Sequence, residues 1–149
     1  VRLISRRLSP IGNKIKNIPF TELLILELSE FQHYHQINVE MNSSIPKLFE
    51  DFKITAQTYL LGYITEVLHN ISKHAKANTL TISSGIGTED SLSLIMQDNG
   101  VGIESINLQG NGLTNIQKRA VLLGGKCEIK SGKSGTSFIL KIPIKLNLK

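Results

Sequence analysis

The sequence lacks the features that stabilise small secreted domains or anchor a chain in a membrane. Its one cysteine, Cys127, cannot form an internal disulfide. No apolar run approaches the roughly 20 residues of a membrane span, and the N-terminus carries no signal-peptide pattern. Tryptophan is absent and aromatic residues make up only 5% of the chain, so aliphatic side chains must fill the core. We therefore expect a soluble, intracellular protein in which Cys127, set in an alternating apolar strand, is buried rather than reactive.

The composition fits one domain. The chain has 149 residues, of which 40% are hydrophobic, enough for a core of ordinary size. Its formal net charge of +5 raises the question of nucleic-acid binding. The basic residues are scattered along the chain, however, and no aromatic residues lie among them. We expect a basic solvated surface without direct nucleic-acid binding; a nucleotide phosphate would suit this charge equally well.

The stretch from Gln97 to Arg119, QDNGVGIESINLQGNGLTNIQKR, carries the strongest local signal. A carboxylate at the end of a strand, Asp98, can accept hydrogen bonds from an amino group. The glycines around it let backbone approach a ligand, and a helix that opens on glycines favours a phosphate at its N-terminus. The glycines in question are Gly100, Gly102, Gly110 and Gly112. The competing interpretation is a hairpin turn at Asn99-Gly100, since Asn-Gly between apolar runs is typical of hairpins.

A helix is expected from about Thr55 to Ala77. At 100° per residue, one face is apolar and is expected to pack against the core: Leu60, Ile64, Leu68, Ile71 and Ala75. A polar face that can simply meet solvent holds Thr65, His69, Ser72 and Lys76. The remaining side holds Glu66, Asn70, Lys73 and His74. A carboxylate and an amide one turn apart can hold hydrated Mg²⁺ or orient a water, and a lysine can meet a phosphate. The alternative is an ordinary solvated row of hydrogen-bonded side chains.

The remaining pattern predicts an α+β fold. Residues 1–8 are expected to end a helix, and Thr21 is expected to cap a second one that runs to Phe31, with His33 and His35 near its end. Strands are expected at 37–41, 79–83, 92–97, 126–130 and 137–144, the last with Phe138, Leu140, Ile142 and Ile144 on one face. A helix over 113–123 is expected to end at Gly124-Gly125. This order favours a two-layer α/β sandwich, with helices on one face of a mixed, mostly antiparallel sheet.

Four segments in this order resemble the ATP-binding domain of bacterial sensor histidine kinases: EVLHNISKHAKA, LSLIMQDNGVGI, GNGLTNIQKRAVLLGGKCEI and GTSFILKIPI. The resemblance covers about residues 50 to 145 and is greatest to the nitrate-sensor type. This family belongs to the GHKL superfamily, together with gyrase-type topoisomerases, mismatch-repair ATPases and certain chaperones. It implies a Bergerat-type ATP-binding fold over 21–149, preceded over 1–20 by the end of a dimerisation helix and a linker.

The resemblance also implies roles for individual residues, with ATP and Mg²⁺ as cofactors. Asn70 would coordinate the Mg²⁺ that bridges the phosphates, Glu66 would polarise the attacking group, and Lys73 and His74 would contact phosphate. Asp98 would accept from the adenine amino group, with Thr136 supporting that end of the site. The pocket and the phosphate loop would be shaped by Gly100, Gly102, Gly110, Gly112 and Leu113.

The implied activity is transfer of the ATP γ-phosphoryl group to a histidine outside this chain. None of the four histidines, His33, His35, His69 and His74, has the family's acceptor context. The implied partners are the phosphoacceptor and dimerisation domain of a homodimeric parent kinase, followed by a DNA-binding response regulator. The fragment itself is expected to be cytoplasmic and free of membrane contact; anchoring of the parent in the cell membrane stays open.

Two alternatives share the motifs. One is a nucleotide-binding regulatory module without transfer activity, and the other is a serine kinase that inhibits a sigma factor. The segment before Pro10 fits the sensor kinases better than the serine kinase. A gyrase-type ATPase would need a transducer domain, which we do not expect within these 149 residues.

Overall fold

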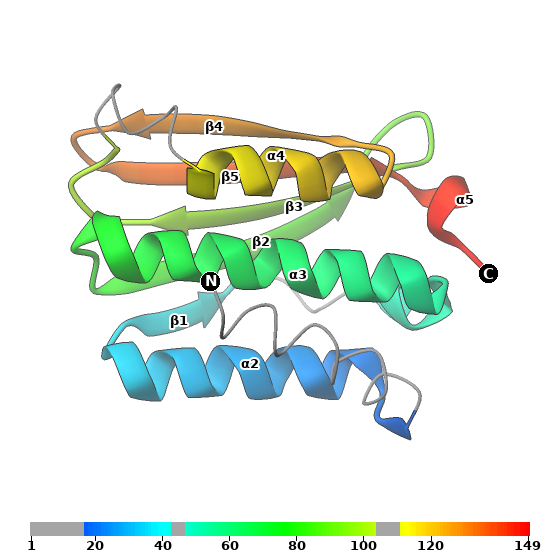
Figure 1. Ribbon diagram of the computed structural model, residues 1–149, viewed down its shortest axis with the longest axis horizontal. Coiled ribbons are helices and arrows are strands. Elements are labelled where there is room, and N and C mark those ends of the chain that lie inside the picture. Colours follow the sequence, from blue (N-terminus) through cyan, green and yellow to red (C-terminus); the bar gives the residue numbers. More distant parts are fainter. Residues whose placement is uncertain (1–16, 43–46, 104–110) are drawn as a thin grey trace.

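A five-stranded mixed sheet forms one layer of the molecule, in the order β1-β2-β3-β5-β4 (Figure 1). The computed structural model describes residues 17–42, 47–103 and 111–149. The edge strand β1 runs parallel to β2, and the other neighbours are antiparallel. The strands are β1 Asn38–Met41, β2 Thr79–Ile86, β3 Ser91–Asp98, β4 Lys126–Gly132 and β5 Gly135–Pro143.

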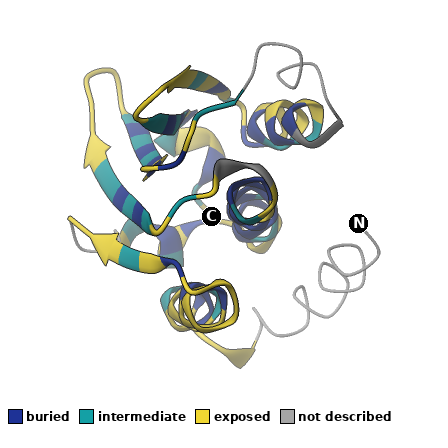
Figure 2. Ribbon diagram, turned by 90° about the vertical axis from the view of Figure 1, so that its left-hand side faces the viewer, coloured by how far each residue is buried: buried dark blue, intermediate teal, exposed yellow. Residues whose placement is uncertain are grey.

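Helices cover one face of this sheet and form the second layer. The long helices are α2 (Phe20–His35), α3 (Ile54–Asn70) and α4 (Asn111–Leu122), with α3 between the other two. The short ones are η1 (Lys47–Asp51), η2 (Ile71–Ala75) and α5 (Ile144–Asn147). Seen end-on, buried residues gather where the helices face the sheet (Figure 2). The predicted two-layer α+β architecture is confirmed.

The core is aliphatic, as the shortage of aromatic residues requires. Alternation in β3 buries Leu92, Leu94 and Met96 against the helices. The expected inward residues of α4 are all buried: Leu113, Ile116, Ala120 and Leu123. Helix α4 ends as predicted, because the N–H groups of Gly124 and Gly125 donate to the carbonyls of Val121 and Ala120.

Helix α3 is buried nearly all round, which the predicted division into faces did not anticipate. Because α3 lies between α2 and α4, residues that would face solvent in a helix at the edge of the layer are covered by the flanking helices here. Thr65, expected in solvent, is buried, and its hydroxyl donates to the carbonyl of Leu61 at 2.8 Å. His69 is exposed as expected.

The start of α2 is capped from another element rather than by Thr21. Thr21 lies inside the helix and the cap position is held by Pro19, which supplies no side-chain bond. Instead Glu50 of η1 accepts the backbone N–H groups of Phe20 (3.1 Å) and Thr21 (2.6 Å) and the Thr21 hydroxyl. Burial alone would raise the pKa of Glu50, but these hydrogen bonds lower it below its ordinary value.

The C-terminal end departs from the predicted strand. β5 ends at Pro143, and Ile144 starts α5 instead of continuing the strand's apolar face. The tail then returns to the segment before α3: Lys53 N–H donates to Asn147 at 2.8 Å, and Lys149 N–H donates to Asp51 at 3.1 Å. An isolated bridge between Phe52 and Leu148 completes this clasp.

Two expectations concern the chain ends and the membrane. The predicted helix over 1–8 and most of the predicted linker lie outside the described residues, so the domain division at residue 20 stays a prediction. Among the helices of residues 17–42, 47–103 and 111–149, none combines the length and hydropathy of a membrane span.

Candidate functional site

Asp98 ends β3 as a buried carboxylate with one oxygen already engaged. It is only 2% exposed, and its Oδ1 accepts the backbone N–H groups of Gly100 at 2.9 Å and Thr136 at 3.2 Å. Neither bond uses Oδ2, which leaves an acceptor for the amino group of a ligand. Burial raises the pKa of Asp98, and the two backbone hydrogen bonds oppose that rise.

The loop after Asp98 is fixed to the sheet by Asn99. Its side-chain oxygen accepts the N–H groups of Asn78 and Thr79, each at 3.0 Å, and its amide donates to Asn78 at 2.7 Å. The hairpin interpretation of Asn99-Gly100 is wrong, because β3 pairs with β2 and β5 and the chain leaves it toward α4.

Close backbone approaches explain two glycines at this loop. Gly102 has φ +83°, and a Cβ there would collide with the carbonyl of Gly132. Gly135, which the sequence analysis did not single out, would bring a Cβ onto the carbonyl of Asp98. The Ile103 N–H also donates to the Ser131 hydroxyl, at 2.6 Å. The β4–β5 turn therefore packs directly on the loop that carries Asp98.

Thr136 links that turn to the carboxylate. Its side chain is buried, and its hydroxyl lies 3.0 Å from that of Ser131. Its backbone N–H makes one of the two bonds to Asp98, so the residue lies beside that carboxylate, and its role at the adenine end of the site stays a prediction. Gly100, the other donor, is buried as well.

Glu66 and Asn70 lie one turn apart on α3 and are both buried, with exposures of 7% and 8%. The alternative of a solvated row is therefore wrong for these two residues. Arg119 of α4 approaches Glu66, with Nη2 3.7 Å from Oε1, and its buried Nε has no hydrogen-bond partner among the described residues. Sequence reasoning missed Arg119 as a site residue, although it follows the inward Ile116 by three positions.

The helix after Asn70 is not α-helical, contrary to prediction. It continues as the π-helical turn η2, which ends at Ala75 and is followed by Lys76 with φ +49°. Such turns change the direction in which side chains leave a helix, and they are frequent at functional sites. Lys73 lies exposed in η2. His74 lies in the same turn, but its side chain is outside the described part of the structure.

The start of α4 forms the other side of the candidate site. Gly110 lies outside the described residues, whereas Gly112 is the second residue of α4. Leu113 buries its side chain in the core, so only its backbone could meet a ligand. The first N–H groups of a helix have no partner within it, which suits this helix start to an anion.

These groups lie at one end of the molecule. The C-terminal ends of α3 and β3, the start of α4 and the β4–β5 turn are all found there (Figure 1). The buried carboxylate suits a base with an amino group, and the helix start suits phosphates. Among residues 17–42, 47–103 and 111–149, no group of three or more His, Cys, Asp or Glu side chains could hold a metal ion. Mg²⁺ commonly completes its shell with water and substrate phosphates, so Glu66 and Asn70 could contribute without such a group.

The family described as histidine kinase-, DNA gyrase B-, and HSP90-like ATPase matches residues 55–146. The chain belongs to this family. It is an ATPase domain of the histidine kinase type, as its motifs indicated. Sensor histidine kinase LiaS of Bacillus subtilis (strain 168) is 31% identical over 97% of this chain and 39% of its own length. Nitrate/nitrite sensor protein NarQ of Escherichia coli (strain K12) is 27% identical over 75% of this chain and 20% of its own length.

Solved structures show the same fold. The histidine kinase domain of the blue-light activated kinase of Erythrobacter litoralis, EL346, superposes with a TM-score of 0.71 at 21% identity, covering 87% of this chain and 67% of that one. The ATP-binding domain of PrrB from Mycobacterium tuberculosis gives 0.65 at 20% identity, covering 85% and 94%. The chain spans about two fifths of LiaS and a fifth of NarQ.

Proposed function

We propose that this chain is the catalytic domain of a two-component sensor kinase, which binds ATP with Mg²⁺ and transfers the γ-phosphoryl group to a histidine outside the chain. The buried carboxylate of Asp98 is the observation that carries the nucleotide assignment. A carboxylate held in low dielectric by two backbone donors, with its second oxygen unused by them, suits an adenine amino group. Guanine carries a carbonyl at the corresponding position, and an ionised carboxylate would repel it.

Each of the remaining site residues has a role in this proposal. Asn70 holds Mg²⁺ through its side-chain oxygen, and Lys73 and His74 contact phosphate. Gly100 and Gly102 shape the adenine pocket, and Thr136 fixes Asp98. Gly110, Gly112 and the backbone of Leu113 approach the phosphates at the start of α4.

The chemistry requires positioning and charge stabilisation more than covalent participation by the protein. Bound Mg²⁺ would supply neutralisation of the charge that develops on the transferring group. Glu66 polarises the attacking imidazole of the acceptor by accepting its proton or orienting its ring. Arg119 holds the Glu66 carboxylate in place through the contact between α4 and α3.

The partners follow from this assignment. They are the histidine-bearing dimerisation domain of a larger, homodimeric parent and a DNA-binding response regulator downstream. Residues 1–20 would connect to that domain, and this part of the parent would lie in the cytoplasm. Burial of Glu66 and Asn70 favours a transferring domain over a regulatory module. The relatives above, which are named as sensors, favour a histidine over a serine acceptor.

Titration calorimetry with a non-hydrolysable ATP analogue tests the binding half of the proposal, with and without Mg²⁺ and with a GTP analogue as control. We expect adenine-selective binding that strengthens with Mg²⁺. A folded chain that binds neither analogue would refute the assignment. Glu66→Gln tests the second half of the proposal, which is phosphoryl transfer. It is expected to keep the analogue affinity and lose transfer of labelled phosphate to the parent's histidine-bearing domain.

A further inference from the structure

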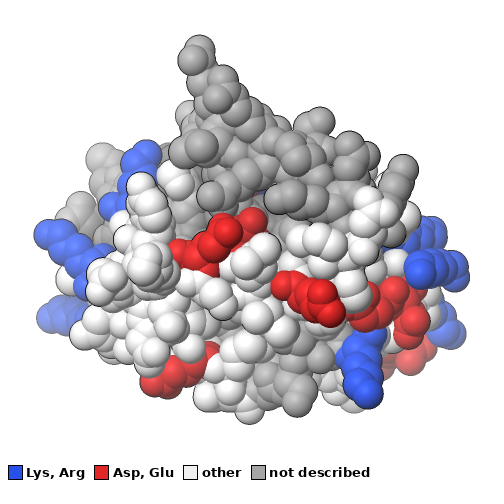
Figure 3. Space-filling model, turned by 90° about the horizontal axis from the view of Figure 1, so that it is seen from below, with Lys and Arg blue, Asp and Glu red and all other residues white. Residues whose placement is uncertain are grey.

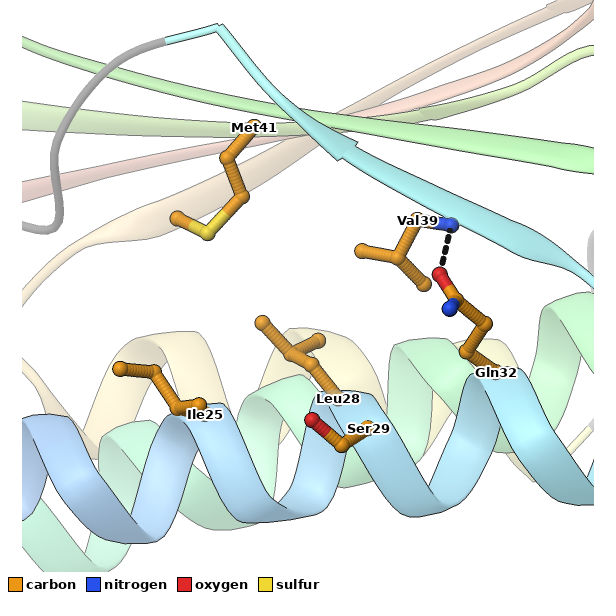
Figure 4. Close-up of a pocket in the computed structure, with 6 residues that line it drawn as sticks. All are labelled: Ile25, Leu28, Ser29, Gln32, Val39 and Met41. Atoms are coloured by element: carbon orange, nitrogen blue, oxygen red, sulfur yellow. Dashed lines mark hydrogen bonds between the residues drawn. The ribbon is translucent and has the colours of Figure 1, made fainter.

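A groove lies between α2 and the edge strand β1, and none of its lining residues belongs to the candidate nucleotide site. It has a volume of about 160 Å³ and is lined by Ile25, Leu28, Ser29, Gln32, Val39 and Met41. Side chains from the helix and the strand point toward one another across it (Figure 4). A cavity of about 150 Å³ accommodates benzene, so the groove has room for one branched or aromatic side chain.

Apolar side chains remain in solvent along this groove. Ile25 is 53% exposed and Met41 is 41% exposed, and Leu26, which follows Ile25 in α2 but does not line the groove, is 51% exposed. Single exposed apolar residues need no explanation, but a contiguous apolar surface rimmed by polar residues is typical of an interaction site.

The described segment that forms the groove, residues 17–42, carries formal charges of one sign. Residues 17–42 contain Glu22, Glu27, Glu30 and Glu40 and no lysine or arginine, although the whole chain has a formal net charge of +5. The face that carries α2 shows acidic side chains among uncharged ones, with lysines and arginines toward its sides (Figure 3). A partner that covers this surface is therefore expected to be basic.

The backbone of β1 argues against an extended partner. On the outer edge of β1, the N–H of Val39 donates to the side-chain oxygen of Gln32 at 2.8 Å. That donor is not available to an added strand. On α2 the lining residues Ile25, Leu28 and Gln32 follow helical spacing over about 10 Å. A helix of about two turns that presents apolar residues at the same spacing would match this length.

We propose that the groove between α2 and β1 docks a basic amphipathic helix of a protein partner. The apolar side of that helix lies against Ile25, Leu28 and Met41, and its lysines and arginines lie near Glu22 and Glu30. The proposal does not depend on nucleotide binding or on phosphoryl transfer.

The test uses the ¹⁵N-labelled chain and a helical leucine–lysine peptide with all leucines on one side. Two control peptides are a same-composition isomer with scattered leucines and a leucine–glutamate peptide with the original pattern. We expect the first peptide to shift amide resonances of α2 and β1 and not those of the Asp98 loop. Absence of binding, or shifts elsewhere, would overturn the proposal, as would equal binding of the scattered isomer.

Ile25→Asp supplies the site-specific variant, and Ile86→Asp is its matched control because Ile86 is also exposed (69%) but lies at the end of β2. We expect Ile25→Asp to weaken peptide binding by about tenfold and Ile86→Asp to leave it unchanged. Glu30→Lys is expected to weaken binding and reduce its dependence on salt. Equal effects of both aspartate variants would contradict the proposal. A concentration-dependent dimer that Ile25→Asp abolishes would instead identify a second copy as the occupant.

Discussion

Replacement of Asp98 by asparagine tests the nucleotide site with almost no change of side-chain shape. An amide oxygen can keep both bonds that Oδ1 now accepts, from the N–H groups of Gly100 and Thr136. The amide nitrogen, in contrast, places donors where the adenine amino group needs an acceptor. The variant is therefore expected to keep the fold and lose affinity for ATP.

The size of this loss follows from two terms. A hydrogen bond to a charged group contributes about 1.5–3 kcal/mol, and a buried donor left without an acceptor costs about 1–3 kcal/mol. Together they predict a loss of about 2.5–6 kcal/mol, so binding of a non-hydrolysable ATP analogue is expected to weaken by at least about 100-fold. Calorimetry on wild type and variant measures this ratio directly. Preference for adenine over guanine is also expected to fall, because the amide can donate to a guanine carbonyl.

The stability of Asp98→Asn serves as the control for its loss of affinity. The raised pKa of Asp98 determines whether the substitution is expected to raise or lower that stability. Between the ordinary value of 3.8 and the raised value, the folded chain holds the Asp98 proton more tightly than the unfolded chain. The stability contributed by this group is therefore complete below 3.8 and is lost as pH rises through the folded pKa. Removing the ionisable group is expected to leave the Tm at pH 7 equal or higher. As pH rises from 3.8 through the raised pKa of Asp98, the affinity of the wild type for the analogue is expected to rise. The affinity of Asp98→Asn is expected to stay constant over the same pH range.

Two results would refute this reasoning. Unchanged affinity in Asp98→Asn would remove the carboxylate from adenine recognition. A large fall in Tm would mean that the carboxylate is mainly structural. Asp98→Ala is the comparison, because it leaves the N–H groups of Gly100 and Thr136 without their acceptor and is expected to lower both affinity and Tm.

Three further substitutions and one labelling experiment test other parts of the structure. Asn70→Ala is expected to weaken Mg²⁺-dependent binding of the ATP analogue while adenosine binding stays nearly intact; equal losses in calorimetry would indicate a damaged helix instead. Arg119→Ala leaves the Glu66 carboxylate without its cation and is expected to lower stability by about 2 kcal/mol in urea unfolding, whereas a Glu66→Gln/Arg119→Ala double variant regains part of that loss. Glu50→Ala removes the cap of α2 and is expected to lower stability by about 1–2 kcal/mol with unchanged analogue affinity, and no loss would mean that water replaces the cap. Burial raises the pKa of the Cys127 thiol, so a disulfide reagent is expected to react with it only in denaturant; rapid labelling of the native chain would contradict its burial.

Periodicity was a reliable guide wherever one face of an element meets the core and the other meets water. Strand β3 and helix α4 satisfy that condition, and their buried faces lie where alternation and helical spacing predicted. Helix α3 does not, because it is flanked by helices on both sides. There the same spacing predicted solvent for Thr65 and left open a solvated row containing Glu66 and Asn70, all of which are buried.

Contacts between distant parts of the chain were not predictable from local pattern. Glu50 caps a helix that begins 30 residues earlier, and nothing near Thr21 indicates this. The approach of Arg119 to Glu66 depends on how α4 packs on α3. The candidate site was still largely predictable, because Asp98 and its glycines need specific residue types at adjacent positions. Gly135 was missed because the backbone that it avoids belongs to a different strand.

The contacts that the C-terminal residues 147–149 make with the segment before α3 limit how far this chain can be shortened. Asn147 also donates through its side-chain amide to the carbonyls of Leu123 and Pro143, so it joins the end of α4 to the approach to α3. The backbone N–H of Lys149 donates to the carbonyl of Asp51, the residue after the glutamate that caps α2. Trimming residues 147–149 would therefore disturb three helices far apart in sequence. An affinity tag that pulls this tail away is expected to mimic a destabilising mutation, and a tag at the β4–β5 turn would instead disturb the support of Asp98.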